Sequence, residues 1–141
     1  MKHYFHEIKV KTSKPLEFID ITDNVQSVVA NSGIANGLVM IFSNHTTAAV
    51  RINERCGRLQ NDMEMLLHEM VPQNKQYRHN EATVDGRGNA HSHLISLLIG
   101  GSETVPVAGG KLRLGTWQSI FFIELDGPRD TRQLTITVVG E

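Results

Sequence analysis

This sequence of 141 residues has little of what several protein classes require. Its single cysteine, Cys56, excludes an internal disulfide and fits a reducing compartment. The formal net charge is only −1, so the chain has no basic field to follow a nucleic-acid backbone. Five Phe, two Tyr and one Trp are too few and too scattered to form a base-stacking platform. We therefore expect no nucleic-acid partner.

Long hydrophobic runs are also missing. The longest run, residues 38–42, has the length of a strand and falls far short of the roughly 18 residues of a membrane span. Near the N-terminus, Glu7 and Lys9 stand where a signal peptide would be apolar. These absences predict a cytoplasmic protein with no membrane partner. A chain of this size buries roughly two thirds of its unfolded surface, so we expect one domain over residues 1–141.

What the sequence does contain is a series of strand patterns separated by a few helical ones. Alternating or continuous apolar residues predict strands at residues 4–12, 16–21, 38–42, 46–53, 104–107, 111–114, 116–125 and 132–139. Helical spacing predicts helices at residues 23–32, 58–71 and 90–99. Residues 73–88 show no period, and a loop of that length is often functional. This order predicts an α+β fold built on a large antiparallel sheet.

Two histidines stand in the first turn of the helix expected after Asn89. Residues two apart on a helix point about 200° apart, so His91 and His93 cannot both face one target there. The helical wheel places His91 within the apolar arc and His93 at its edge, beside Leu97. An irregular first turn would instead let both histidines chelate one metal ion. On pattern alone, one of the two is a packed or capping histidine and the other is free to face a site, and the wheel favours His91 as the buried one.

Polar residues alternate along the strand expected at residues 46–53. If His45 opens this strand, one of its faces carries His45, Thr47, Ala49, Arg51 and Asn53. That face is polar enough to line a pocket, and the alternative is a solvated face with an incidental histidine. Glu54 follows as either a pocket carboxylate or a solvated turn residue. Asp62 lies at the margin of its helix's apolar face, where it either complements the helix dipole or acts in a cleft as ligand or base.

Three further residues have two interpretations each. His79, inside the long loop, is either a site residue or an incidental polar residue. Trp117, the only tryptophan, is more typical of a core or an interface than of a platform for a ligand. Arg129, in the turn DGPR, is suited to bind a phosphate or carboxylate, although turn arginines are usually just exposed.

Six short motifs, in their order and spacing, resemble one known family. They are NHTT at residues 44–47, INE at 52–54, ND at 61–62, GNAHSHL at 88–94, GTWQ at 115–118 and DGPR at 126–129. The family is YjbQ, also named secondary thiamine-phosphate synthase. The resemblance covers nearly the whole chain from residue 38 to residue 141, and GTWQ is its most specific part.

The resemblance implies a small α+β protein that assembles as a trimer, with a polar metal-binding cleft near the subunit interface. It implies a divalent metal ion, zinc or magnesium, bound by His45, His79 and His93. Polar partners with catalytic roles would be Asn53, Glu54 and Asp62. The expected substrate-binding residues are Arg51, Trp117, Gln118 and Arg129.

The family name implies a transferase that joins a pyrimidine diphosphate to a thiazole phosphate. Such a reaction needs cations to stabilise the departing pyrophosphate, a role suited to Arg51, Arg129 and a bound metal ion. It also needs a surface for the pyrimidine, which Trp117 would offer. The word "secondary" warns that the physiological reaction can differ. Two alternatives stay open: metal-assisted hydrolysis of a phosphate ester, and a non-catalytic oligomer that binds a small anionic ligand.

Overall fold

The computed structural model describes residues 1–141, which form two antiparallel sheets, three α-helices and one 3₁₀ helix. In chain order the elements are β1 (Lys2–Val10), β2 (Glu17–Asp20), α1 (Thr22–Ser32), β3 (Asn36–Ser43), β4 (Ala48–Glu54), α2 (Gly57–Met70), η1 (Arg78–Glu81), α3 (Ala90–Ile99), β5 (Ser102–Ala108), β6 (Lys111–Leu112), β7 (Gln118–Glu124) and β8 (Arg132–Gly140). The larger sheet has the order β1-β8-β3-β5-β6 and the smaller one β2-β7-β4. The predicted α+β class is confirmed.

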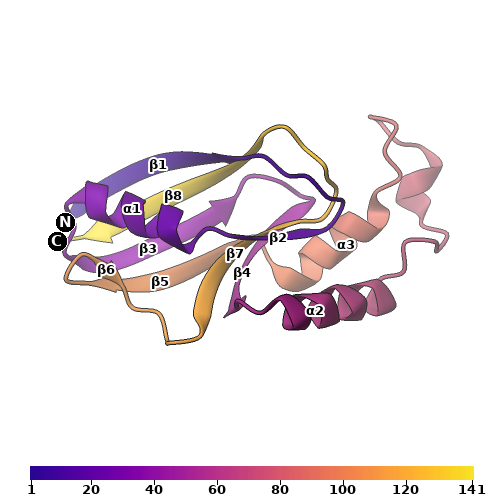
Figure 1. Cartoon of the computed structure of the whole chain (residues 1–141). Helices are drawn as coiled ribbons and strands as arrows, with labels where there is room; N and C mark the ends of the chain where they lie inside the picture. Colours follow the sequence, from indigo (N-terminus) through magenta and orange to yellow (C-terminus); the bar gives the residue numbers. More distant parts are fainter.

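The two chain ends lie together at one end of the molecule (Figure 1). Strands β1 and β8 pair along their whole lengths, so that Lys2 lies opposite Gly140. Helices α2 and α3 and the loop between them extend toward the opposite end (Figure 1). None of the helices is both long and apolar enough to cross a membrane.

Strand β7 connects the two core clusters of the protein, because its side chains are buried on both faces. Ile120 and Phe122 face the larger sheet and α1, in a core cluster of 16 buried residues. Phe121 and Ile123 point the other way, into a second cluster of seven that includes Ile95 of α3. Successive residues of a strand point to opposite faces, so this continuous apolar run requires cover on both sides.

The strand predicted at residues 46–53 begins later than expected. His45 lies in the loop between β3 and β4 rather than on the strand. Ala48 and Val50 face the main core, as predicted. The expected polar face is wrong, however, because Ala49 is fully buried with Ile95 under α3. Its neighbours on that face therefore do not form one continuous polar surface with His45.

The turn at residues 126–129 leaves no room for a side chain at Gly127. A Cβ there would overlap the carbonyl oxygen of Lys14 and come within 2.8 Å of Cγ of Glu124. We expect Gly127→Ala to lower the free energy of unfolding by about 1–3 kcal/mol, because backbone and side chain must shift. Gly57→Ala is the matched control, since nothing lies within 4 Å of its Cβ position at the start of α2. Urea unfolding measures both, and equal losses would contradict the expectation.

Candidate functional site

A cleft opens at the end of the sheets away from the chain termini. Its volume is about 490 Å³, within the range of small-molecule sites. It is lined by Asn44, His45, Thr46, Thr47, His79, Ala82, Val84, Asp85, Asn89, His93, Arg129 and Arg132. These residues come from the β3–β4 loop, the long loop with η1, the start of α3, the β7–β8 turn and the start of β8. Segments far apart in the sequence thus converge on one polar site.

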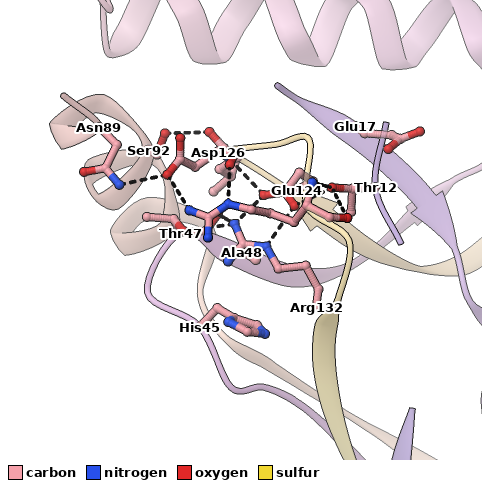
Figure 2. Close-up of polar contacts among 12 residues, drawn as sticks. Thr12, Glu17, His45, Thr47, Ala48, Asn89, Ser92, Glu124, Asp126 and Arg132 are labelled. Carbon is pink, nitrogen blue, oxygen red and sulfur yellow. Dashed lines mark hydrogen bonds and ion pairs between the residues drawn. The ribbon is translucent and has the colours of Figure 1, made fainter. Parts of the chain in front are cut away.

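Arg132, which lines the cleft, forms a buried ion pair with Glu124 (Figure 2). Arg132, at the start of β8, donates from Nε and Nη2 to the carboxylate of Glu124 at the end of β7. Arg132 Nη2 also donates to Thr47 Oγ1 at 3.0 Å, and the hydroxyl of Thr12 donates to Glu124 Oε2 at 2.8 Å. Both charged residues are buried, because Arg132 is 3% exposed and Glu124 is 0% exposed. The network ties together the ends of four strands beneath the cleft.

The ionised form of Glu124 is stabilised by its partners. Burial by itself would raise the pKa of this carboxyl. Hydrogen bonds from Arg132, from the backbone N–H of Asp126 and from Thr12 outweigh burial and hold the pKa of Glu124 below its ordinary value. The ion pair therefore remains charged at neutral pH.

His45 lies beside Arg132 and is held by a backbone hydrogen bond (Figure 2). The N–H of Gln133 donates to its Nε2 at 2.8 Å. Burial, and then the charge of Arg132, lower the pKa of His45, although Glu124 opposes this. A neutral imidazole that accepts at Nε2 carries its proton on Nδ1. In this orientation His45 has no free lone pair for a metal ion.

His79 and His93 form an edge-to-face pair, with ring centroids 4.8 Å apart. Nε2 of His79 lies 3.1 Å from Asn89 Oδ1, and the side-chain amide of Asn89 donates to Asp126 Oδ2 at 2.8 Å. Asn89 caps α3 by position, but its side chain makes no capping hydrogen bond. It connects the long loop to the β7–β8 turn instead.

All three predicted metal ligands line the cleft, yet they do not form a complete metal site. No group of three or more His, Cys, Asp or Glu side chains is placed to hold a metal ion. His45 is already committed to a backbone hydrogen bond, which leaves His79 and His93. These residues fit a cation only as a two-imidazole site whose other ligands are water or substrate oxygens.

Arg129 lies in the cleft, as its place in the DGPR turn suggested. Its Nε and Nη2 donate to the backbone oxygen and to Oδ2 of Asp126, both at 2.9 Å. Neither Arg129 nor Arg132 has a hydrogen bond from Nη1 to a protein group. Both guanidinium groups are fixed in place and retain donors for an anion.

The other predicted site residues lie outside the cleft. Strand β4 leads away from it, so that Glu54 is roughly 20 Å along the strand from the cleft residue Thr47. Glu54 pairs in register with Gln118, which places both beside Asn53 and Trp117 at the far end of the smaller sheet. The expected grouping of these residues with the histidines is therefore not found within one chain.

Asp62 and Arg51 are also separate from the histidines. Asp62 is exposed on α2 and does not line the cleft. Arg51 lines a different cavity of about 140 Å³ together with Asn53 and apolar side chains of α2 and β7. Arg51 also forms an exposed ion pair with Glu103 at 3.1 Å. Strand β4 and helix α2 thus carry Arg51 and Asp62 away from the histidines of the cleft.

His91 and His93 diverge as the helical wheel predicted. His91 lines a cavity of about 290 Å³ on another side of α3, which also contains His68 and Asp126. Its Nδ1 is buried without a hydrogen-bond partner, and burial lowers the pKa of His91. His93 faces the cleft with His79. The two histidines therefore belong to different sites.

Sequence reasoning missed Arg132, Glu124 and the bridging role of Asn89. Glu124 offered a signal, because a charged residue inside the apolar run IFFIEL requires a buried partner. Arg132, eight residues later at the start of a strand, was the nearest downstream candidate after the turn arginine. Asn89 gave no such signal, since an asparagine before a helix is explained by capping alone.

Comparison with known proteins shows which family the chain belongs to. Residues 6–141 match the family model described as UPF0047 protein YjbQ-like. The chain belongs to this family. Among UPF0047 proteins, one from Methanothermobacter thermautotrophicus is 48% identical over 141 residues, which span all of this chain and 95% of the relative. YugU of Bacillus subtilis is 39% identical over 135 residues, covering 94% of this chain and 97% of the relative.

A solved structure has a closely similar fold. The crystal structure of a YbjQ-like protein of unknown function from Sulfolobus solfataricus matches with a TM-score of 0.94 and 42% identity. The match covers 99% of both chains. The family resemblance and the YjbQ-like fold predicted from the sequence motifs are thus both confirmed.

Proposed function

We propose that the cleft binds a small phosphorylated substrate and that this UPF0047 chain is a transferase of the thiamine-phosphate synthase type. The observation that carries the proposal is the convergence of three imidazoles and two fixed guanidinium groups on one cleft of about 490 Å³. Arginine forks and imidazole N–H groups are suited to phosphate oxygens.

In the proposed reaction the ring nitrogen of a thiazole phosphate forms a bond to the methylene carbon of a pyrimidine diphosphate. The carbon–oxygen bond to the diphosphate breaks, and pyrophosphate leaves with the electron pair. Arg129 and Arg132 would stabilise the negative charge that develops on pyrophosphate, since donors fixed in advance need no rearrangement. Trp117 and Gln118, at the far end of the smaller sheet, contribute only if a second chain brings them near.

The proposal includes a divalent cation, zinc or magnesium, held by His79 and His93. Imidazole ligands favour zinc over magnesium. A cation there would neutralise part of the diphosphate charge. The protein side chains would supply two ligands, and substrate or water would supply the rest.

We also propose a homo-oligomer, a trimer, that acts in the cytoplasm. The support for oligomerisation is an apolar outer face on the larger sheet. Phe5, Leu38, Met40 and Phe42 are 39–66% exposed there, and exposed apolar patches often mark protein interfaces. Light scattering of the purified chain gives its mass, and a monomer would contradict the proposal. The cytoplasmic location rests on the single cysteine and the absence of a disulfide.

The experiment that tests the function uses the purified full chain with a pyrimidine diphosphate and a thiazole phosphate. Calorimetry measures binding of each, and chromatography measures the joined product and pyrophosphate. A panel of phosphate esters is assayed in parallel for released phosphate. Formation of the joined product supports the transferase. Release of phosphate from the esters without joined product would favour a hydrolase instead. Tight binding without turnover would favour a non-catalytic binding protein.

The proposed cation site predicts how histidine substitutions change the affinity for zinc. We expect His93→Ala to lower zinc affinity by more than about tenfold, because half of the imidazole pair is removed. His45→Ala is expected to have a smaller effect, since its Nε2 accepts from the backbone of Gln133. Metal analysis and zinc calorimetry measure both variants, with the exposed His3→Ala as control. Unchanged affinity in His93→Ala would contradict the cation site.

A further inference from the structure

The hydrogen bonds around His79 fix which of its nitrogens carries the proton. The carboxylate of Asp126 only accepts hydrogen bonds, so the amide NH₂ of Asn89 must face it, at 2.8 Å. The other amide atom, Oδ1, is then the one that faces His79, at 3.1 Å. An amide oxygen cannot donate, so Nε2 of His79 must donate to it. The free lone pair of a neutral His79 is therefore on Nδ1.

Asp126 is itself held in place. Its Oδ2 also accepts from Arg129 Nη2 at 2.9 Å, and its Oδ1 lies 3.4 Å from Arg87 Nη1. Two guanidinium groups hold the carboxylate in this orientation. The orientation of Asn89, and with it the proton position on His79, is set from the β7–β8 turn.

His45, in the same cleft, is fixed in the opposite sense. The backbone N–H of Gln133 donates to its Nε2 at 2.8 Å, so a neutral His45 has its proton on Nδ1. No protein group accepts a hydrogen bond from that Nδ1, and it is not among the buried atoms without a partner. His45 thus has a donor to offer, whereas His79 has a lone pair.

We propose that the two histidines have opposite roles fixed by their tautomers, with His45 donating to phosphate through Nδ1–H and His79 binding a zinc-like cation through Nδ1. Asp126 and Asn89 are the positioning residues for His79. This inference rests on the proposed function for the identity of the ligands, but the tautomers themselves do not. It separates His45 from the metal ligands with which the sequence grouped it.

The test is two-bond ¹H–¹⁵N correlation spectroscopy of the full chain labelled at histidine nitrogens, at a pH where the histidines are neutral. Variants His45→Gln and His79→Gln assign the two rings by loss of signal. We expect His79 as the Nε2–H tautomer and His45 as the Nδ1–H tautomer. The opposite tautomer on either ring would overturn the inference.

A pair of asparagine variants tests the positioning role. Asn89→Ala removes the acceptor, so His79 should become a mixture of tautomers and zinc affinity should fall about 10–100-fold. Asn80→Ala is the matched control. Its Oδ1 accepts from the backbone N–H of Ala90 at 3.1 Å, which also connects the long loop to the start of α3, and it makes no hydrogen bond to the His79 ring. An unchanged His79 tautomer in Asn89→Ala, or an equal change in Asn80→Ala, would contradict the role of Asn89.

Two probes separate this inference from the proposed function. Zinc should shift Nδ1 of His79 most, and inorganic phosphate should shift Nδ1 of His45 most. The reverse pattern would overturn the assignment of roles. If the expected tautomers are found but the wild type binds no phosphorylated ligand, the proposed function fails and the tautomers stand.

Discussion

Replacing Glu124 by Gln is expected to lower the free energy of unfolding by about 3–5 kcal/mol, the usual effect of removing one member of a buried ion pair. Glu124 is 0% exposed and accepts hydrogen bonds from Arg132, Thr12 and the backbone of Asp126. A glutamine has a similar shape but leaves the charge of Arg132 buried without a counter-charge. Urea unfolding followed by circular dichroism measures the loss.

The matched control is Glu103→Gln. Glu103 also pairs with an arginine, but its partner Arg51 is 59% exposed, so solvent screens the pair. We expect a change of no more than about 1 kcal/mol. Equal losses in the two variants would show that the buried position of Glu124 has no special importance.

The lowered pKa of Glu124 also predicts how the stability of the fold changes with pH. The folded pKa of Glu124 is lowered, so its stabilising contribution is fully present above the ordinary glutamate pKa. That contribution is lost as the pH falls through the lowered folded pKa. Unfolding measured over an acid series should therefore show a smaller loss in Glu124→Gln than in the wild type. A parallel loss in both proteins would exclude Glu124 as a source of the acid sensitivity.

Removing the guanidinium of Arg129 is expected to weaken binding of a pyrimidine diphosphate by about 10–100-fold. A hydrogen bond to a charged group contributes about 1.5–3 kcal/mol, and about 1.4 kcal/mol corresponds to a factor of ten. Arg129 retains Nη1 for an anion while Nε and Nη2 are fixed on Asp126. Calorimetry of Arg129→Ala measures the change in affinity.

Two variants make this result specific. Arg129→Lys keeps the charge but loses the planar fork, so we expect an intermediate affinity. Arg113→Ala removes an exposed arginine that does not line the cleft, and its affinity should match the wild type. Thermal unfolding of each variant checks that the loss is not one of folding. Wild-type affinity in Arg129→Ala would exclude the cleft as the phosphate site.

Local periodicity predicted the elements and some of the site correctly. The strand predicted at residues 116–125 is present as β7, Gln118–Glu124. Helical geometry alone separated His91 from His93, because 3.6 residues per turn cannot direct both to one point. These features depend only on residues close in the sequence.

Local patterns contain neither the direction of a strand nor a partner that is distant in the sequence. Asn53 and Glu54 follow His45 closely in the chain, but β4 carries them to the far end of the smaller sheet. The resemblance implies that His45 is a metal ligand, whereas in the structure its Nε2 accepts from the N–H of Gln133, 88 residues away. No local pattern contains such a hydrogen bond.

The sequence by itself determined the α+β class, the strands and helices that form the core, and the family to which the chain belongs. Periodicity and motif spacing are local properties, and both depend only on the order of the residues. Only the tertiary structure decided which polar residues share the cleft, and that His45 and His79 have opposite tautomers. Those properties arise from β-pairing and from hydrogen bonds between distant segments, whose geometry exists only after the sheets have formed.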